Sequence, residues 1–151
     1  MTYFGFSGLF FLIVFAIAII PAIFYLLTLQ NALYAVSPGN RRMPPGNVWL
    51  LFIPVFNIIY IFIVVEAIGS SFKLEYEKFG VFPGDKPTYN LGLAMAIVQI
   101  CSIFIPFGGI VSFVLWIAHW VKVNENKNEI INLRNNSRLG DNEPSIFTDN
   151  G

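Results

Sequence analysis

Long apolar runs separated by short polar segments dominate this chain. The first run covers residues 9–29 and contains no charged residue, and the second covers residues 48–68 with a single acid, Glu66. A helix needs about 20 mostly apolar residues to cross the hydrocarbon core of a bilayer. The pattern therefore predicts membrane-spanning helices over 9–29 and 48–68. Pro21 and Pro54 lie within these two runs, and each predicts a kink.

The last apolar run, over residues 91–121, is interrupted by the sequence Pro-Phe-Gly-Gly at 106–109. Proline and glycine together favour a tight turn, which predicts a hairpin of two helices over 91–105 and 110–123. At 1.5 Å per residue these helices are about 22 and 21 Å long, which is shorter than the hydrocarbon core of about 30 Å. The hairpin therefore either spans a thinned bilayer or dips into the membrane and returns.

Polar segments complete the predicted architecture. Residues 37–47 contain three prolines and two glycines, which predicts a non-helical loop. Residues 70–79 place three aromatic side chains on one helical face beside charged residues, as expected for a helix lying at the membrane surface. The prediction is an all-α fold with one membrane domain over 1–134, formed by four transmembrane helices in two hairpins and a short interfacial helix. The polar residues 135–151 are expected to form a flexible tail.

Composition supports a membrane environment. Hydrophobic residues make up 56% of the chain and charged residues only 12%, whereas a soluble domain carries about 25% charged residues. Nine Lys and Arg balance nine Asp and Glu, so no basic excess is available to neutralise the phosphates of a nucleic acid. The lone Cys101 lies in an apolar run, where we expect a buried thiol without an internal disulfide.

The distribution of basic residues predicts an orientation. Two hairpins would place the N-terminus, the loop 69–88 and the tail on one side of the membrane, together with seven of the nine Lys and Arg. Only Arg41 and Arg42 would lie on the other side. Because cytoplasmic loops carry the excess of positive charge, both termini are predicted to face the cytoplasm.

No hydrolase, phosphate-binding or zinc motif occurs in the sequence. We therefore expect a protein that is not an enzyme, with no catalytic residue, no metal and no cofactor. His119 is the single histidine, which excludes haem ligation by two histidines of one chain. A structural role for His119 is favoured over that of a haem ligand.

Ionisable residues inside a bilayer are functional candidates by default, and Glu66 is the acidic residue of the second apolar run. It lies three residues before Gly69, so its carboxylate can reach lipid headgroups or Lys73. The alternatives are contact with His119 and a role as a proton or ion site. Transport is disfavoured because a deep acid is typical of the known dimeric four-helix exporters, whereas Glu66 lies near a helix end.

The other candidate residues are Asn57 and Gln99 inside the predicted helices, and Arg41, Arg42 and Trp49 near the outer end of the second helix. Helix packing is favoured over ligand binding for the two amides. The two arginines either bind lipid phosphates or loop carbonyls, or they cap a polar pocket. Such a pocket would form if a kink at the proline of the second run freed a carbonyl near Asn57.

The central third of the chain carries a specific string of residues. Residues 40–50 read Asn-Arg-Arg-Met-Pro-Pro-Gly-Asn-Val-Trp-Leu and residues 53–57 read Ile-Pro-Val-Phe-Asn, with Glu66 following. This string resembles an uncharacterised family of small bacterial four-helix membrane proteins and is distantly similar to a broader bacterial membrane family of unknown function. The resemblance covers about residues 29–79. It implies a multi-pass protein of the bacterial inner membrane, and it implies no activity.

These observations lead to one favoured function and two alternatives. We expect a non-enzymatic accessory or assembly subunit, or a homo-oligomer, with membrane lipid and a protein partner or second copy as its contacts. One alternative is a small transporter or channel component. The other is a lipid- or quinone-binding membrane protein that uses Arg41, Arg42 and the helix face with Trp116 and His119.

Overall fold

A computed structural model describes residues 2–102 and 108–142 of the chain. These residues form four α-helices and no strand, which confirms the all-α prediction. The helices are α1 (Thr2–Ala35), α2 (Pro54–Lys78), α3 (Tyr89–Cys101) and α4 (Gly108–Asn142), and two 3₁₀ helices, η1 (Pro38–Asn40) and η2 (Pro45–Phe52), connect α1 to α2.

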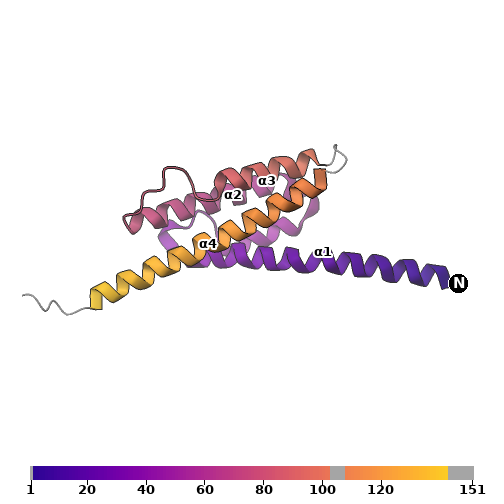
Figure 1. The fold of residues 1–151 in the computed structure, drawn as a ribbon, viewed down its shortest axis with the longest axis horizontal. Helices are drawn as coiled ribbons and strands as arrows, with labels where there is room; N and C mark the ends of the chain where they lie inside the picture. Colours follow the sequence, from indigo (N-terminus) through magenta and orange to yellow (C-terminus); the bar gives the residue numbers. More distant parts are fainter. Residues whose placement is uncertain (1, 103–107, 143–151) are drawn as a thin grey trace, which may run out of the picture.

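The helices run between two ends of an elongated molecule (Figure 1). The C-terminal ends of α1, α2 and α4 meet at one end, which we call the charged end, and the N-terminus lies at the opposite, uncharged end. The sequence analysis had placed the N-terminus beside the loop 69–88 and the tail. This grouping is not found, because the N-terminal end of α1 and the C-terminal end of α4 point to opposite ends of the molecule.

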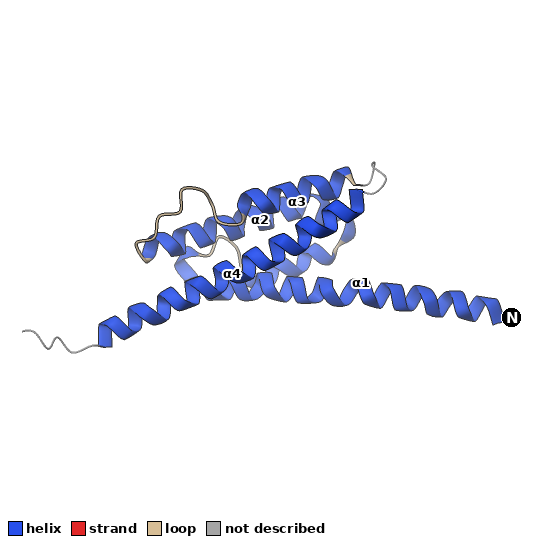
Figure 2. Cartoon of the chain, viewed as in Figure 1, coloured by secondary structure: helices blue, strands red, loops and turns tan. Residues whose placement is uncertain are grey.

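The segment between α1 and α2 accounts for this difference (Figure 2). After the loop that follows α1, η2 turns back along α1, where Trp49 Nε1 donates a hydrogen bond to Gln30 Oε1 at 2.8 Å. The chain reverses at Ile53, and α2 returns to the charged end. Here Arg42 N, from the loop, donates to Ser71 Oγ at 2.9 Å. Thus η2 and α2 form one hairpin that begins and ends at the charged end, and α3 and α4 form a second.

Pro54 acts differently from the prediction. Pro54 is the first residue of α2, where its missing N–H leaves no helical hydrogen bond unmade and its fixed φ favours the first turn. It therefore starts a helix instead of kinking one, and the second helix begins at 54 instead of 48. Pro45 starts η2 in the same way. Pro21 lies inside α1, which continues past it as one helix.

Two further bounds differ from the prediction. The segment 70–79 forms no separate interfacial helix: α2 continues to Lys78, with Phe72 and Tyr76 fully or almost fully buried in the core. The fourth helix extends to Asn142, well into the region predicted as a flexible tail, and the residues 143–151 lie outside the described ranges. So do residues 103–107, which contain the first half of the predicted hairpin turn. Cys101 is exposed, not buried.

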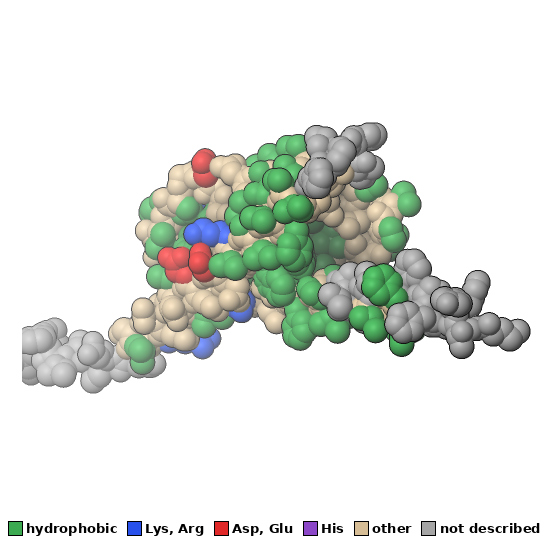
Figure 3. Space-filling model, turned by 45° about the vertical axis from the view of Figure 1, so that its right-hand side comes forward, with side chains coloured by type: hydrophobic (Ala, Val, Ile, Leu, Met, Phe, Trp, Pro, Cys, Tyr) green, Lys and Arg blue, Asp and Glu red, His purple; other side chains and the backbone are tan. Residues whose placement is uncertain are grey.

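The surface, like the two ends, has a charged part and an apolar part. Figure 3 shows charged side chains on one part of the molecule and a broad area of exposed apolar side chains on the other. Where side chains are described, α2 is the one helix long and apolar enough to cross a bilayer, and Ile19–Ala35, the described stretch of α1, is a shorter apolar helix. The 13 residues of α3 correspond to about 20 Å, which is less than a hydrocarbon core of about 30 Å.

Candidate functional site

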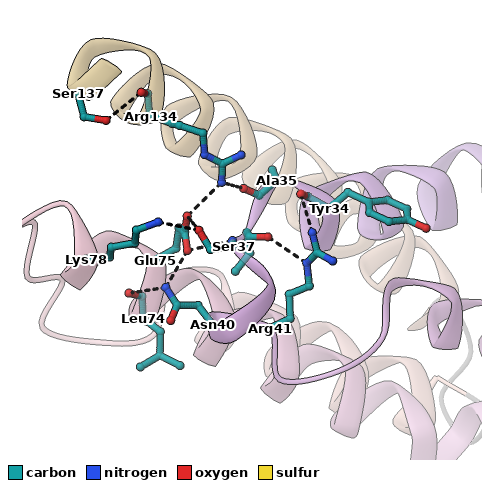
Figure 4. Close-up of polar contacts among 11 residues, drawn as sticks. Tyr34, Ala35, Ser37, Asn40, Arg41, Leu74, Glu75, Lys78, Arg134 and Ser137 are labelled. Atoms are coloured by element: carbon teal, nitrogen blue, oxygen red, sulfur yellow. Dashed lines mark hydrogen bonds and ion pairs between the residues drawn. The ribbon is translucent and has the colours of Figure 1, made fainter. Parts of the chain in front are cut away.

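The most highly connected polar residue is Glu75, near the C-terminal end of α2, and its side chain is fully buried (Figure 4). Ser37 donates two hydrogen bonds to this carboxylate, from N to Oε2 at 3.0 Å and from Oγ to Oε1 at 2.7 Å. Asn40 Nδ2 donates to Oε2 at 2.8 Å. Arg134, on α4, donates from a guanidinium nitrogen to Oε1 at 3.1 Å. Glu75 thus joins the end of α1, the loop after it and α4.

The charges around Glu75 compensate its burial. Burial raises the pKa of the Glu75 carboxyl, but the hydrogen bonds from Ser37, Asn40 and Arg134 outweigh this effect and hold the pKa below its usual value. Arg134 also donates to the carbonyl oxygen of Ala35 at the end of α1. A buried carboxylate is tolerated when it is paired and its oxygens accept hydrogen bonds, and Glu75 meets both conditions.

Arg41 completes the end of α1. Its guanidinium donates from Nε to Val36 O at 2.9 Å and from a terminal nitrogen to Tyr34 O at 3.1 Å. These are carbonyls at the C-terminus of a helix, which lack partners within the helix itself. The arginines were expected either to bind lipid phosphates or loop carbonyls or to cap a polar pocket. Arg41 binds backbone carbonyls. Neither Arg41 nor Arg42 lines the two cavities in which Asn57 lies.

Glu66 lies at the boundary of the charged end. Its carboxylate forms an ion pair with Lys86 and accepts a hydrogen bond from Ser70 Oγ at 3.0 Å. Lys86 thus takes the place of the predicted partners Lys73 and His119. Glu66 and Lys86 also line an open groove of about 760 Å³ beside α2. The other lining residues are Arg42, Phe62, Ile63, Ala67, Ser70, Lys73, Leu74 and Glu77.

His119, on α4, is completely buried. Its Nδ1 lies 3.0 Å from Tyr25 Oη, and its Nε2 has no hydrogen-bond partner within the described chain. The Nε2 atom faces Gly92 of α3, where an added Cβ would lie only 2.7 Å away. Because α3 occupies this space, the arrangement leaves no room for an iron atom beside Nε2. His119 packs against an aromatic neighbourhood in which Trp120 Nε1 donates to Thr28 Oγ1 at 2.8 Å.

Asn57 and Gln99 meet at the uncharged end. Both line two small cavities, one of about 170 Å³ enclosed by α1, η2, α2, α3 and α4 and one of about 180 Å³ between α2 and α3. Neither side chain forms a hydrogen bond within the described ranges, although both were expected to contribute to helix packing through their amides. Among the described residues, no cluster of three or more potential ligands for a metal ion occurs.

The residue that sequence reasoning missed is Glu75, together with Ser37, Asn40 and Arg134. One local signal was available: Glu75 lies three residues after Phe72 and next to Tyr76, on the aromatic face that proves to be the core. We find no match of this chain to any family model, curated protein or solved structure. The resemblance to small bacterial membrane proteins therefore stays a prediction.

Proposed function

We propose that this protein is a multi-pass integral membrane protein whose charged end lies at the cytoplasmic surface. The support comes from the distribution of charge. Residues 1–40, 43–65 and 87–121 contain no Asp, Glu, Lys or Arg. The charged segments between them come together at one end through contacts such as those of Glu75 with Arg134 and of Glu66 with Lys86. Because positive charge is retained on the cytoplasmic side, this end is assigned to the cytoplasm and the N-terminus to the opposite side.

Helix lengths support a specific way of inserting into the bilayer. The 34 residues of α1 correspond to about 51 Å and exceed a core of about 30 Å. In this proposal α1 crosses the membrane once, and both hairpins enter from the charged end and return to it. The short α3 suits a hairpin that dips into the membrane. The proposal keeps the predicted cytoplasmic side for the C-terminal tail and assigns the N-terminus to the opposite side.

Labelling of single cysteines tests this orientation. In a Cys101→Ser background, Thr2→Cys is expected to react with a membrane-impermeant maleimide in intact cells. Asn136→Cys, on the exposed part of α4, is expected to react only after the membrane is permeabilised. Reaction of both cysteines from the same side would contradict the proposal.

Within this orientation, we propose that the protein acts without enzymatic activity as an accessory subunit or as a homo-oligomer. The observation that carries this proposal is the N-terminal half of α1, which extends beyond the other helices (Figure 1). Its apolar side chains Leu9, Leu12 and Ile13 are 58%, 66% and 50% exposed. By contrast, Leu29 and Leu33 in the C-terminal half of α1 are fully buried. Exposed apolar side chains on a helix that extends beyond the others in its chain offer a packing surface to a helix of another chain.

Photo-crosslinking tests the proposed contact. A photoreactive phenylalanine analogue at Leu12 is expected to give one discrete protein adduct, whose mass identifies a second copy or a partner subunit. The matched control is Val114 on α4, which is 59% exposed and is expected to give no protein adduct. If the two positions give the same products, or if Leu12 yields lipid adducts alone, the subunit proposal is wrong.

A further inference from the structure

The groove beside α2 is charged at one end and apolar at the other. Its volume is about 760 Å³. Phe62, Ile63 and Lys73 belong to one side of α2, and Arg42 and Lys86 join them from the two loops at the charged end. Figure 3 shows charged side chains of both signs next to the apolar surface. The groove thus combines basic groups with an apolar floor.

Two basic side chains of the groove, those of Arg42 and Lys73, have charged groups that are available for a ligand. The backbone of Arg42 is fixed against α2 by its hydrogen bond to Ser71 Oγ at 2.9 Å. Its guanidinium forms no ion pair or hydrogen bond within the described part of the chain, and the same holds for the Lys73 ammonium. Arg41, next to Arg42 in sequence, is by contrast fully engaged with helix carbonyls. The fold therefore holds the Arg42 backbone in place and leaves its charged group available.

The acidic residues of the groove do not cancel these charges. Glu66 is already paired with Lys86 and hydrogen-bonded to Ser70. Glu77 also lines the groove, and among the described contacts it forms no ion pair with Lys73. With Glu66 and Lys86 neutralising each other, two cations and one acid remain, so the groove carries a net positive charge that suits an anion.

The apolar part of the groove lies towards the uncharged end of α2. Phe62 and Ile63 form this part, and Ile63 is 53% exposed. Lys73 follows Phe62 by eleven residues, a separation of about 16 Å along the helix. A ligand that fills the groove must therefore be apolar at one end and anionic at the other.

We infer that this groove binds an anionic phospholipid, with its phosphate contacted by Arg42 and Lys73 and an acyl chain lying against Phe62 and Ile63. A guanidinium presents paired donors that match the oxygens of a phosphate. Basic pockets between membrane helices on the cytoplasmic side bind anionic headgroups. The inference rests on the proposed function only in placing the charged end at a membrane surface.

Native mass spectrometry of the full chain in mild detergent tests the site, with phosphatidylglycerol as the probe. The double variant Arg42→Gln/Lys73→Gln is expected to bind phosphatidylglycerol about 30-fold more weakly, because each basic residue near a membrane surface contributes about a fivefold factor. The matched control Lys122→Gln/Lys127→Gln removes the same charge from α4 and is expected to bind as the wild type does. Equal losses in the two double variants would overturn the site.

Two further comparisons separate a lipid from a free anion. Phosphatidylcholine is expected to bind at least tenfold more weakly than phosphatidylglycerol, and millimolar inorganic phosphate is expected to leave the lipid bound. Equal binding of the two lipids, or full displacement by phosphate, would overturn the inference.

A third variant retains all basic residues of the groove, so it tests the site even if the double variant Arg42→Gln/Lys73→Gln fails to fold. Ile63→Ser is expected to weaken phosphatidylglycerol binding about fivefold, in line with the apolar contact it removes. Unchanged binding would refute the apolar half of the site. The labelling at residues 2 and 136 and the crosslinking at Leu12 do not involve the groove, so the proposed function and the lipid site can fail separately.

Discussion

The two ends of the molecule are held together by different kinds of contact. At the charged end, the buried Glu75 carboxylate accepts hydrogen bonds from Ser37, Asn40 and Arg134 and thereby connects three segments. At the uncharged end, Asn57 and Gln99 line cavities, and within the described ranges their side chains form no hydrogen bond. The helices there are in contact mainly through apolar side chains.

This difference follows from the environment proposed for each end. Lipid tails are as apolar as the side chains that face them, so burying apolar surface between helices in a bilayer gives little driving force. Helices in lipid associate through close packing, which small residues allow. Gly92 provides such a close approach between α3 and the His119 side chain. Near water, hydrogen bonds and ion pairs to a buried carboxylate add directional constraints that packing alone lacks. The following predictions test this contrast, from the largest expected effect to the smallest.

Removing the Glu75 carboxylate is expected to have the largest effect. Glu75→Ala leaves Arg134 and the donors of Ser37 without their acceptor, and breaking a buried ion pair costs about 3–5 kcal/mol of unfolding free energy. The control is Glu125→Ala, because Glu125 forms an exposed ion pair with Lys122 and such pairs contribute about 1 kcal/mol or less. Unfolding of both variants in mild detergent, followed by circular dichroism, measures the difference. Equal losses would mean that the charged end does not depend on its buried carboxylate.

A methyl group at Gly92 is the corresponding test of the uncharged half. The Cβ of Gly92→Ala would lie 2.7 Å from His119 Nε2 and from a methyl carbon of Val65. Such overpacking costs about 1–3 kcal/mol. Gly109→Ala serves as the control, since its added Cβ meets nothing within 4 Å, and alanine is the better helix former.

Partial recovery of stability in the double variant Gly92→Ala/Val65→Ala would show that the collision is the cause. If Gly92→Ala is as stable as the wild type in thermal unfolding, close packing at this position does not hold α3 in place.

The helices themselves could be predicted from the sequence because apolar periodicity and run length are local properties. The separate course of η2 could not be predicted from the sequence. A proline such as Pro54 is compatible both with a kink within a helix and with the first position of a new helix. The position of the N-terminus depended on that choice. A hairpin within 45–78 returns the chain to the charged end, whereas one continuous helix would have carried it across.

The Glu75 site could not be predicted from the sequence for a different physical reason, which is that its contacts join segments far apart along the chain. Its partners Ser37 and Arg134 are 38 and 59 residues away in sequence. The position of Glu75 three residues after Phe72 places it on the aromatic face of α2, but nothing near it in the sequence identifies these two partners. Arg134 on α4, which contacts both Ala35 at the end of α1 and Glu75, supplies the charged partner of the buried acid.

Acidic pH should weaken the charged end selectively, by less than removal of the side chain. The pKa of Glu75 is lower in the folded protein than its usual value of 4.5. A carboxyl of this kind contributes stability at neutral pH that is lost as the pH falls from about 4.5 through the folded pKa. Thermal unfolding between about pH 6 and pH 3 is expected to show a steeper decrease for the wild type than for Glu75→Gln. Parallel curves would exclude Glu75 as the titrating group.

Asn57→Leu is expected to have the smallest effect, within about 0.5 kcal/mol of the wild type. The side chain is similar in size, and in the described structure Asn57 donates and accepts no side-chain hydrogen bond. Unfolding of Asn57→Leu, Gln99→Leu and the double variant gives a thermodynamic cycle that measures any coupling between the two amides. A loss of about 2 kcal/mol in Asn57→Leu, with strong coupling to Gln99, would mean that these amides are bonded to each other or through a shared water molecule. The uncharged end would then also depend on directional polar contacts, and the difference between the two ends would be one of degree.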